Sequence, residues 1–184
     1  MMKLFYIILG ATPIGRNTEQ HDVFFGIAPS LKDLVQPIKD FWPEAGQRIH
    51  IDCYREVTHV DGYSVKISER GSEQSVEKLF FVNLGGYTHG RFEELHEQHL
   101  MVGTSTTEII KRVKQTDFYQ NMGFKNAESH IDDKHGVDVD EIFNINDILP
   151  QKMKDKYTIV LEKSDYTVVE NEMHLGYLKL DKIK

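Results

Sequence analysis

Two short polar patterns in the first third of the chain combine a histidine with a carboxylate two residues away. Glu19 precedes His21, and His50 precedes Asp52. Side chains two residues apart on a β-strand lie on the same face, so each pair would present an imidazole and a carboxylate together. If the two strands are neighbours, the four side chains converge. Two imidazoles and two carboxylates are an adequate donor set for Zn, Mn or Fe, and together with Arg16 they could instead bind an anion.

The same polar residues recur later in the chain. Residues 3–21, KLFYIILGATPIGRNTEQH, return as KLFFVNLGGYTHGRFEELH at residues 78–96, with an offset of 78 − 3 = 75 and no gap. The sequence His-Ile-Asp at 50–52 returns at 130–132, with an offset of 130 − 50 = 80. An internal repeat of this period indicates a duplicated unit. The candidate ligand-binding residues are therefore Arg16, Glu19, His21, His50 and Asp52, with their counterparts Arg91, Glu94, His96, His130 and Asp132.

A scaffold role explains the same residues without a ligand. Arg16 and Glu19 could form a loop ion pair, and His21 and His50 could bind strand-end carbonyls. No H-E-x-x-H or C-x-x-C spacing is present, so no catalytic residue and no cofactor is assigned. The candidate metal ligands are His21, His50, Asp52, His96, His130 and Asp132, and the second copy adds His99, Asp133 and His135.

The elements that must position these residues follow from hydrophobic periodicity. Strands are predicted at 3–9 and 19–28. A helix then begins at Ser30, and Pro37 should kink it or divide it into two short helices. Residues 48–68, with a central Asp-Gly, indicate a β-hairpin. In the second copy, strands are predicted at 78–84 and 93–103, followed by a helix with a capping box.

These elements indicate an α+β fold in which a β-β-α-β-β unit is duplicated in tandem and packed with pseudo-twofold symmetry. Residues 157–161 match 63–67 at an offset of 94, which we favour over a match of 143–145 at an offset of 80. Residues 146–156 are then an insertion, and 168–180 form a last strand. The predicted division is 1–72 for the first repeat unit, 73–163 for the second, and 164–184 for a C-terminal strand and tail.

Composition excludes some classes of protein. The chain has 184 residues, with 40% hydrophobic and 28% charged residues, as in globular domains. A formal charge of −7 argues against a nucleic-acid partner. No apolar run approaches a membrane span, and the apolar N-terminal run returns in mid-chain, which favours a strand over a secretion signal. The single cysteine, Cys53, excludes an internal disulfide, so we expect a soluble cytoplasmic protein in which this thiol is a small hydrophobic side chain.

Two loops follow strands where a phosphate-binding loop would lie. GATPIG and GGYTHG lack both the P-loop and the dinucleotide-binding glycine patterns, and a strand rather than a helix follows each of them. A serine-nucleophile motif of the G-x-S-x-G kind is also absent from the sequence. The sequence therefore points to neither nucleotide binding nor serine hydrolase chemistry.

The combination of KLFYxxLG, GRNxEQHDVFFGIA and HIDxxxxVxxVDGY resembles the bacterial family known as domain of unknown function 1543. The resemblance spans residues 1–145 and implies a member with two copies of the domain. The second copy departs from the pattern at Phe92-Glu93 and Gln98-His99. No activity is implied by this resemblance, and no catalytic residue is carried over from it.

Three hypotheses for function remain open. The first is a non-enzymatic binding or regulatory module with a polar pocket in each repeat, which binds a small anionic ligand or a protein partner. The second is a metal-dependent hydrolase in which the His, Asp and Glu side chains hold the ion and activate water. The third is a structural or oligomerisation domain, in which the repeat supports a homodimer.

Overall fold

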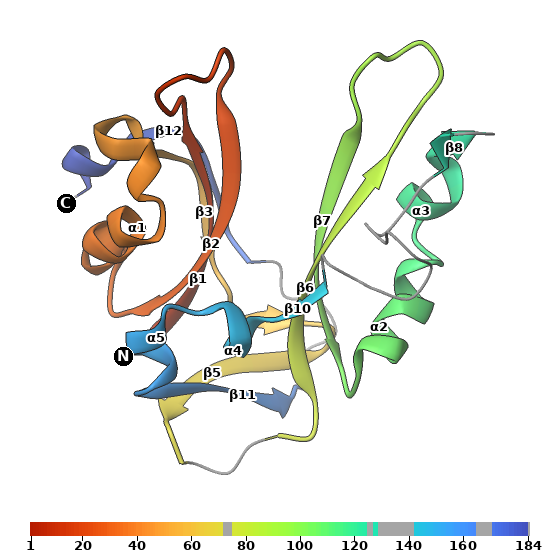
Figure 1. Cartoon of the computed structure of the whole chain (residues 1–184). Helices are drawn as coiled ribbons and strands as arrows, with labels where there is room; N and C mark the ends of the chain where they lie inside the picture. The colour runs from red at the N-terminus through yellow and green to blue at the C-terminus, as the bar shows by residue number, and fades with distance from the viewer. Residues whose placement is uncertain (72–74, 125–126, 129–141, 165–170, 184) are drawn as a thin grey trace. The chain divides into compact units, whose positions relative to one another are not determined.

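A computed structural model describes the chain except for residues 72–74, 125–126, 129–141, 165–170 and 184. The chain divides into two compact units (Figure 1). Unit 1 comprises Met1–Gln74 and Ile148–Lys184, and unit 2 comprises Ser75–Asp147. No helix in the part of the chain that the structure describes is long and apolar enough to cross a membrane.

Unit 1 is built on two antiparallel sheets and short helical segments. One sheet has four strands in the order β12-β3-β1-β2, and the other has three in the order β11-β5-β4. The strands are β1 (Lys3–Ala11), β2 (Gln20–Ala28), β3 (His50–Glu56), β4 (His59–Val60), β5 (Tyr63–Glu69), β11 (Tyr157–Lys163) and β12 (Met173–Lys179). The helices are α1 (Val35–Phe41) and α5 (Gln151–Lys154), with 3₁₀ turns at Leu31–Leu34, Pro43–Arg48 and Leu180–Lys182.

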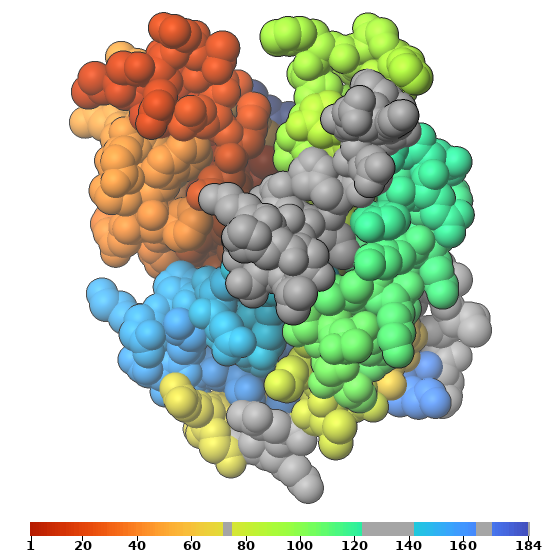
Figure 2. Space-filling model, turned by 45° about the vertical axis from the view of Figure 1, so that its right-hand side comes forward, coloured from red at the N-terminus to blue at the C-terminus, as the bar shows by residue number. Residues whose placement is uncertain are grey.

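The helical segment between β2 and β3 packs against the four-stranded sheet. It lies beside β2 in both views (Figure 1, Figure 2). Leu34 and Ile38, four residues apart on this segment, are fully buried, and each such side chain stabilises the fold by about 1.5–3 kcal/mol. The segment is divided into a 3₁₀ turn and α1, with Pro37 in the first turn of α1. Two short helical pieces are therefore present, but they meet between Leu34 and Val35 rather than at Pro37.

The predicted hairpin at 48–68 is only partly correct. Its turn is as expected, because Asp61 and Gly62 connect β4 to β5 with φ angles of 51° and 78°. The first arm is the two-residue strand β4, however, and not β3, which instead joins the four-stranded sheet beside β1. The chain thus leaves one sheet and enters another between β3 and β4.

Strand β5 pairs antiparallel with β11, which lies 94 residues further along the chain. At the centre of this ladder Lys66 lies opposite Val160, and these two residues are separated by the offset of the sequence match, 160 − 66 = 94. The match between 157–161 and 63–67 thus joins two strands that pair with each other. Because of this pairing, residues 148–163 belong to compact unit 1. The boundaries predicted at residues 72 and 163 separate sequence repeats rather than compact units, and they stay a prediction.

Unit 2 contains a three-stranded antiparallel sheet in the order β10-β6-β7. Its elements are β6 (Lys78–Gly86), β7 (Leu95–Gly103), α2 (Thr106–Val113), α3 (Asp117–Asn121), β8 (Gly123–Phe124), β9 (Ala127–Glu128), β10 (Ile142–Asn144) and α4 (Ile145–Ile148), which ends at the boundary between the units. Phe80, Val82, Met101, Ile109 and Val113 belong to its core. Helices with antiparallel sheets make the chain an α+β protein, as predicted.

The β1–β2 and β6–β7 hairpins have the same register at the predicted offset of 75. Lys3 lies opposite Ala28 in one, and Lys78 lies opposite Gly103 in the other, where 78 − 3 and 103 − 28 both equal 75. Register in a hairpin is fixed by its loop, so two loops of equal length and similar sequence give two equal ladders.

The turn between β4 and β5 provides a test of this part of the fold. Gly62→Ala would place a side chain at a φ of 78°, so we expect unfolding in urea to show a loss of about 1 kcal/mol. Asp61→Gly is the control, because glycine tolerates the left-handed conformation that Asp61 adopts and should leave stability nearly unchanged. Equal stability of Gly62→Ala and the unmodified protein would contradict the assigned turn.

Candidate functional site

The predicted residues Glu19, His21, His50 and Asp52 converge at one end of the four-stranded sheet. Gly10 of β1 lies opposite His21 of β2 and also opposite His50 of β3. Side chains that are directly opposite in an antiparallel ladder lie on the same face of the sheet, so both imidazoles flank Gly10. Glu19 immediately precedes β2 and completes the group.

Asp52 shares the face of His50 and lies at a β-bulge in β3. Along β3, Cys53 pairs with Ile8 and Ile51 pairs with Leu9, so Asp52 is the extra residue without a partner on β1. A bulge of this kind bends the strand and changes the direction of a side chain. The carboxylate of Asp52 lies over Gly10, where a Cβ atom would be 2.7 Å from its Oδ2 atom.

The four side chains form a chain of close contacts. His21 Nε2 lies 3.1 Å from Asp52 Oδ2 and 3.8 Å from Glu19 Oε2. His50 Nε2 lies 3.0 Å from Glu19 Oε1 and 3.2 Å from Asp52 Oδ1. Asp52 therefore contacts both imidazoles, and both carboxylates contact His50. These contacts are ion pairs whenever the imidazole is protonated.

His50 is the most buried member of the cluster, with a side chain that is only 4% exposed. Its Nδ1 atom lies 3.0 Å from the carbonyl oxygen of Arg48, which can only accept a hydrogen bond, so Nδ1 carries the proton. The ring packs against Tyr177, with ring centroids 4.1 Å apart. Among the described residues Nε2 has no partner with hydrogen-bond geometry, although two carboxylates lie within ion-pair distance. Nε2 is therefore the one polar atom of the ring that is still available for a hydrogen bond.

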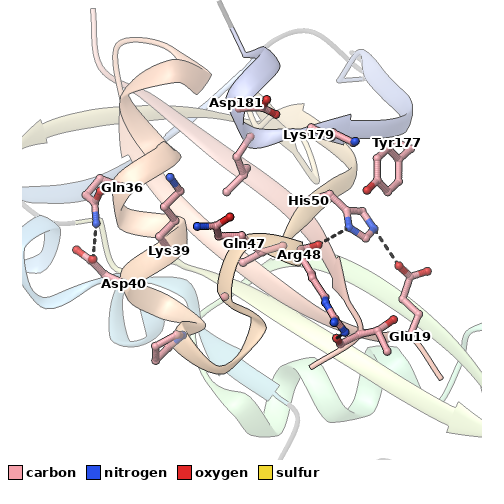
Figure 3. Close-up of a pocket in the computed structure, with 15 residues that line it drawn as sticks. Glu19, Gln36, Lys39, Asp40, Gln47, Arg48, His50, Tyr177, Lys179 and Asp181 are labelled. Carbon is pink, nitrogen blue, oxygen red and sulfur yellow. Dashed lines mark hydrogen bonds and ion pairs between the residues drawn. The ribbon is translucent and has the colours of Figure 1, made fainter. Parts of the chain in front are cut away.

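A pocket of about 970 Å³ opens beside His50 in unit 1 (Figure 3). Its walls come from the loop before β2, from α1 and the 3₁₀ turn after it, and from the chain's C-terminal strand and turn. The charged residues that line it are Glu19, Lys39, Asp40, Arg48, Lys179 and Asp181, and its remaining polar side chains include Gln36, Gln47, His50 and Tyr177.

The acidic side chains of the pocket are engaged with neighbours. Asp40 accepts a hydrogen bond of 2.7 Å from Gln36, and Asp181 lies 3.2 Å from the ammonium group of Lys182. Glu19 contacts His50 as described above. By contrast, the ammonium groups of Lys39 and Lys179 form no hydrogen bond or ion pair with any residue in the described part of the chain. The charged groups of the pocket without a partner among the described residues are therefore these two ammonium groups, while Asp40, bonded to a neutral amide, keeps its negative charge.

Arg16 does not join the cluster. It lies in the exposed turn between β1 and β2, where its backbone N–H donates to the carbonyl of Pro13 at 3.2 Å. It is absent from the residues that line the pocket, and Arg48 takes the place beside His50. Arg48 donates from its guanidinium group to the carbonyl of Thr12 at 3.2 Å.

The candidates of the second copy are arranged differently. Arg91 pairs with Glu93 at 3.0 Å, and Glu94 accepts a hydrogen bond of 3.1 Å from Tyr87. The Nδ1 atom of His96 lies 3.2 Å from the side-chain nitrogen of Asn83. Of the residues that enrich this copy, His99 contacts Glu97 at 2.8 Å. The candidates His130, Asp132, Asp133 and His135 lie outside the described residues.

The register of β10 does not follow the predicted offset of 80. Ile142 pairs with Val82 in the way that Tyr54 pairs with Ile7, and 142 − 54 = 88. Burial agrees, because Val57 and its counterpart at this offset, Ile145, are both buried. The offset given by the pairing of β10 is therefore 88, which is eight residues more than the offset of 80 between His50 and residue 130.

Sequence reasoning missed Lys39, Arg48, Tyr177 and Lys179. Tyr177 and Lys179 lie on the predicted last strand, but only its pairing with β3 brings them to His50, and period-two patterns do not specify a distant partner. Arg48 stands two residues before His50, and its backbone carbonyl rather than its charge fixes the imidazole. Lys39 gave no signal beyond its place on the polar side of α1.

The metal interpretation finds no further support in the geometry. No group of three or more His, Cys, Asp or Glu side chains that could hold a metal ion occurs among the residues with an assigned placement. The candidate ligands His21, His50, Asp52 and His96 are described, and only the first three lie together. The hydrolase alternative stays a prediction, which metal analysis of the purified protein would test.

The bare backbone at Gly10 can be tested by a double-mutant cycle. Gly10→Ala would place a Cβ atom 2.5 Å from His50 Nε2 and 2.7 Å from Asp52 Oδ2, so we expect a loss of about 1–3 kcal/mol in the free energy of unfolding. In a His50→Ala/Asp52→Ala background the same change should cost much less, because both colliding side chains are gone. Equal costs in the two backgrounds would contradict the convergence over Gly10.

The reactivity of the Cys53 thiol reports on the negative charge of Asp52, its neighbour in the sequence. Burial, and then the charge of Asp52, raise the pKa of this thiol above its usual value, so less thiolate is present at pH 8 and alkylation should be slow. Asp52→Asn removes the second cause and should speed alkylation by iodoacetamide. Glu56→Gln, a change of equal charge on the same strand, is the control and should leave the rate unchanged.

The comparisons with known proteins agree with this description of the fold and assign no activity. Residues 16–67, which contain all four clustered side chains, match the family described as Domain of Unknown Function (DUF1543). The crystal structure of a protein Il1583 from Idiomarina loihiensis is similar, with a TM-score of 0.61 and 22% sequence identity over 99% of each chain. At this identity the likeness shows a shared fold. No curated protein matches the chain. The family match supports the resemblance to this domain family over the first part of the chain.

Proposed function

We propose that this protein is a non-enzymatic binding module whose pocket in unit 1 takes a small anionic ligand. The observation that carries the proposal is that the acidic side chains of the pocket have contact partners and two of its ammonium groups do not. Its acidic side chains contact Gln36, Lys182 or His50, whereas the ammonium groups of Lys39 and Lys179 have no partner among the described residues. An anion would supply the contact partner that these two ammonium groups lack.

The dimensions and chemistry of the pocket suit a small polar molecule. A volume of about 970 Å³ is at the upper end of the range for small-molecule sites. The walls carry hydrogen-bonding groups on several sides, including Gln36, Gln47 and the hydroxyl of Tyr177. Polar groups from separate elements of one unit can hold a ligand in a single orientation, which a flat charged surface cannot do.

We also infer that the chain arose by tandem duplication of a β-β-α-β-β unit. The equal registers of the β1–β2 and β6–β7 hairpins and the symmetric pairing of β5 with β11 support this inference. So do the matching loops, in which Gly15 and Gly90 have φ angles of 82° and 81°. The binding proposal concerns unit 1, because the C-terminal residues Tyr177 and Lys179 complete its pocket.

Charge removal at the two free ammonium groups tests the binding proposal. We expect the double variant Lys39→Met/Lys179→Met to bind small anions at least about a hundredfold more weakly, because two charged contacts of about 1.5–3 kcal/mol each are lost. Isothermal titration calorimetry with phosphate, sulfate, acetate and succinate at constant ionic strength would measure the change.

The control for this experiment is Lys32→Met/Lys152→Met. Both residues are exposed lysines of unit 1 that do not line the pocket, so this variant has the same net charge as the test variant. Equal weakening in the two double variants would indicate a general charge effect and would overturn the proposed pocket. Absence of binding by every anion in the unmodified protein would overturn it as well.

A further inference from the structure

We propose that the carboxylate of Glu19 occupies the position on His50 that a carboxylate group of the ligand takes, so that Glu19 is a built-in competitor of the ligand. The ligand class is then a small dicarboxylate, with one carboxylate at His50 and the other at the free ammonium groups. This inference rests on the proposed function, since it names the ligand class and the regulation of the same pocket.

The first argument is the state of His50. Its Nδ1 atom is committed to the carbonyl of Arg48, and its ring is buried against Tyr177. Only Nε2 is left to interact, and it is directed toward Glu19 at the edge of the pocket (Figure 3). A side chain that is 96% buried and offers one polar atom toward a pocket is a built recognition point. At present an internal carboxylate lies 3.0 Å from it.

The second argument is that the Glu19 side chain can move away from the contact, whereas the His50 ring is held in place. Glu19 lies in the loop before β2, and its side chain is 45% exposed. Its departure would break no strand pairing, because the ladder between β1 and β2 begins at Gln20. His50 is held by two strand neighbours and cannot follow it. An incoming carboxylate can therefore displace Glu19 while the imidazole stays in place.

The third argument concerns the ligand's charge. After Glu19 has moved, Asp52 still lies 3.2 Å from His50 Nε2, and it is fixed there by the bulge in β3. A dianionic phosphate at this point would face that carboxylate with two charges, whereas a carboxylate would bring one, as Glu19 does now. The ligand's second charge is better placed elsewhere in the pocket, and Lys39 and Lys179 provide that place.

Two variants of Glu19 test the competition. Glu19→Gln removes the competing charge, and Glu19→Asp keeps the charge but shortens the side chain by one methylene, which withdraws the carboxylate from Nε2. We expect Glu19→Gln to bind succinate about tenfold more tightly than the unmodified protein, and Glu19→Asp to show a smaller gain in the same direction. Calorimetry gives the affinities, and the ¹⁵N resonances of the His50 ring report contact with succinate.

Two controls isolate the role of Glu19. Glu44→Gln makes the same charge change on an exposed residue adjacent to pocket-lining Pro43, and Glu97→Gln removes the carboxylate that lies 2.8 Å from His99 in unit 2. Neither control should alter succinate binding by more than about twofold. Because Glu19 is half-exposed, both of its variants should retain the far-ultraviolet circular dichroism of the unmodified protein.

The outcomes separate this inference from the proposed function. Unchanged or weaker succinate binding in Glu19→Gln would overturn the competition, and an equal gain for phosphate would overturn the ligand class. If anions bind in a manner that depends on Lys39 and Lys179 while Glu19 has no effect, only this inference fails. If no anion depends on the two lysines, the proposed function fails with it.

Discussion

At the end of the four-stranded sheet, His50 and Asp52 reach over a position on β1 that has no side chain. Three strands must be in register for this contact, because His21 and His50 both lie opposite Gly10. Asp52 lies two residues after His50 and shares its face, and the extra residue in β3 occurs at this position. Packing in such a space has little tolerance, so the register of β1 with both neighbours determines the geometry of the whole polar group.

The pocket depends on the same region through a second irregularity. Strand β12 pairs with β3 on both sides of Asp52, but its register shifts between Leu175 and Leu178, where Gly176 has a φ of 119°. The shift places Tyr177 against the ring of His50 and is followed by Lys179 at the pocket wall. Residues more than 120 positions apart in sequence thus meet because two neighbouring strands are both irregular at one level of the sheet.

The sequence predicted those features that depend on short-range patterns. Alternation placed Glu19 with His21 and His50 with Asp52, and the offset of 75 read from the repeat agrees with the registers of the β1–β2 and β6–β7 hairpins. It did not predict features that depend on long-range pairing. The switch of sheets after β3, the bulges and the partner of β12 have no periodic signature, so Arg48, Tyr177 and Lys179 were missed. The candidate Arg16 does not line this pocket.

The two copies also differ in the chemistry that they carry. At the offset of 88 that the β10 register indicates, the sequence counterparts of His50 and Asp52 are Asp138 and Asp140, which lie outside the described residues. In the described part of the second copy, His96, the counterpart of His21, contacts Asn83. A scaffold role would be equally useful to both copies and would keep the same residues in each. Among the described residues, the two imidazoles that lie together beside a pocket belong to unit 1, which supports the binding role proposed for the cluster there.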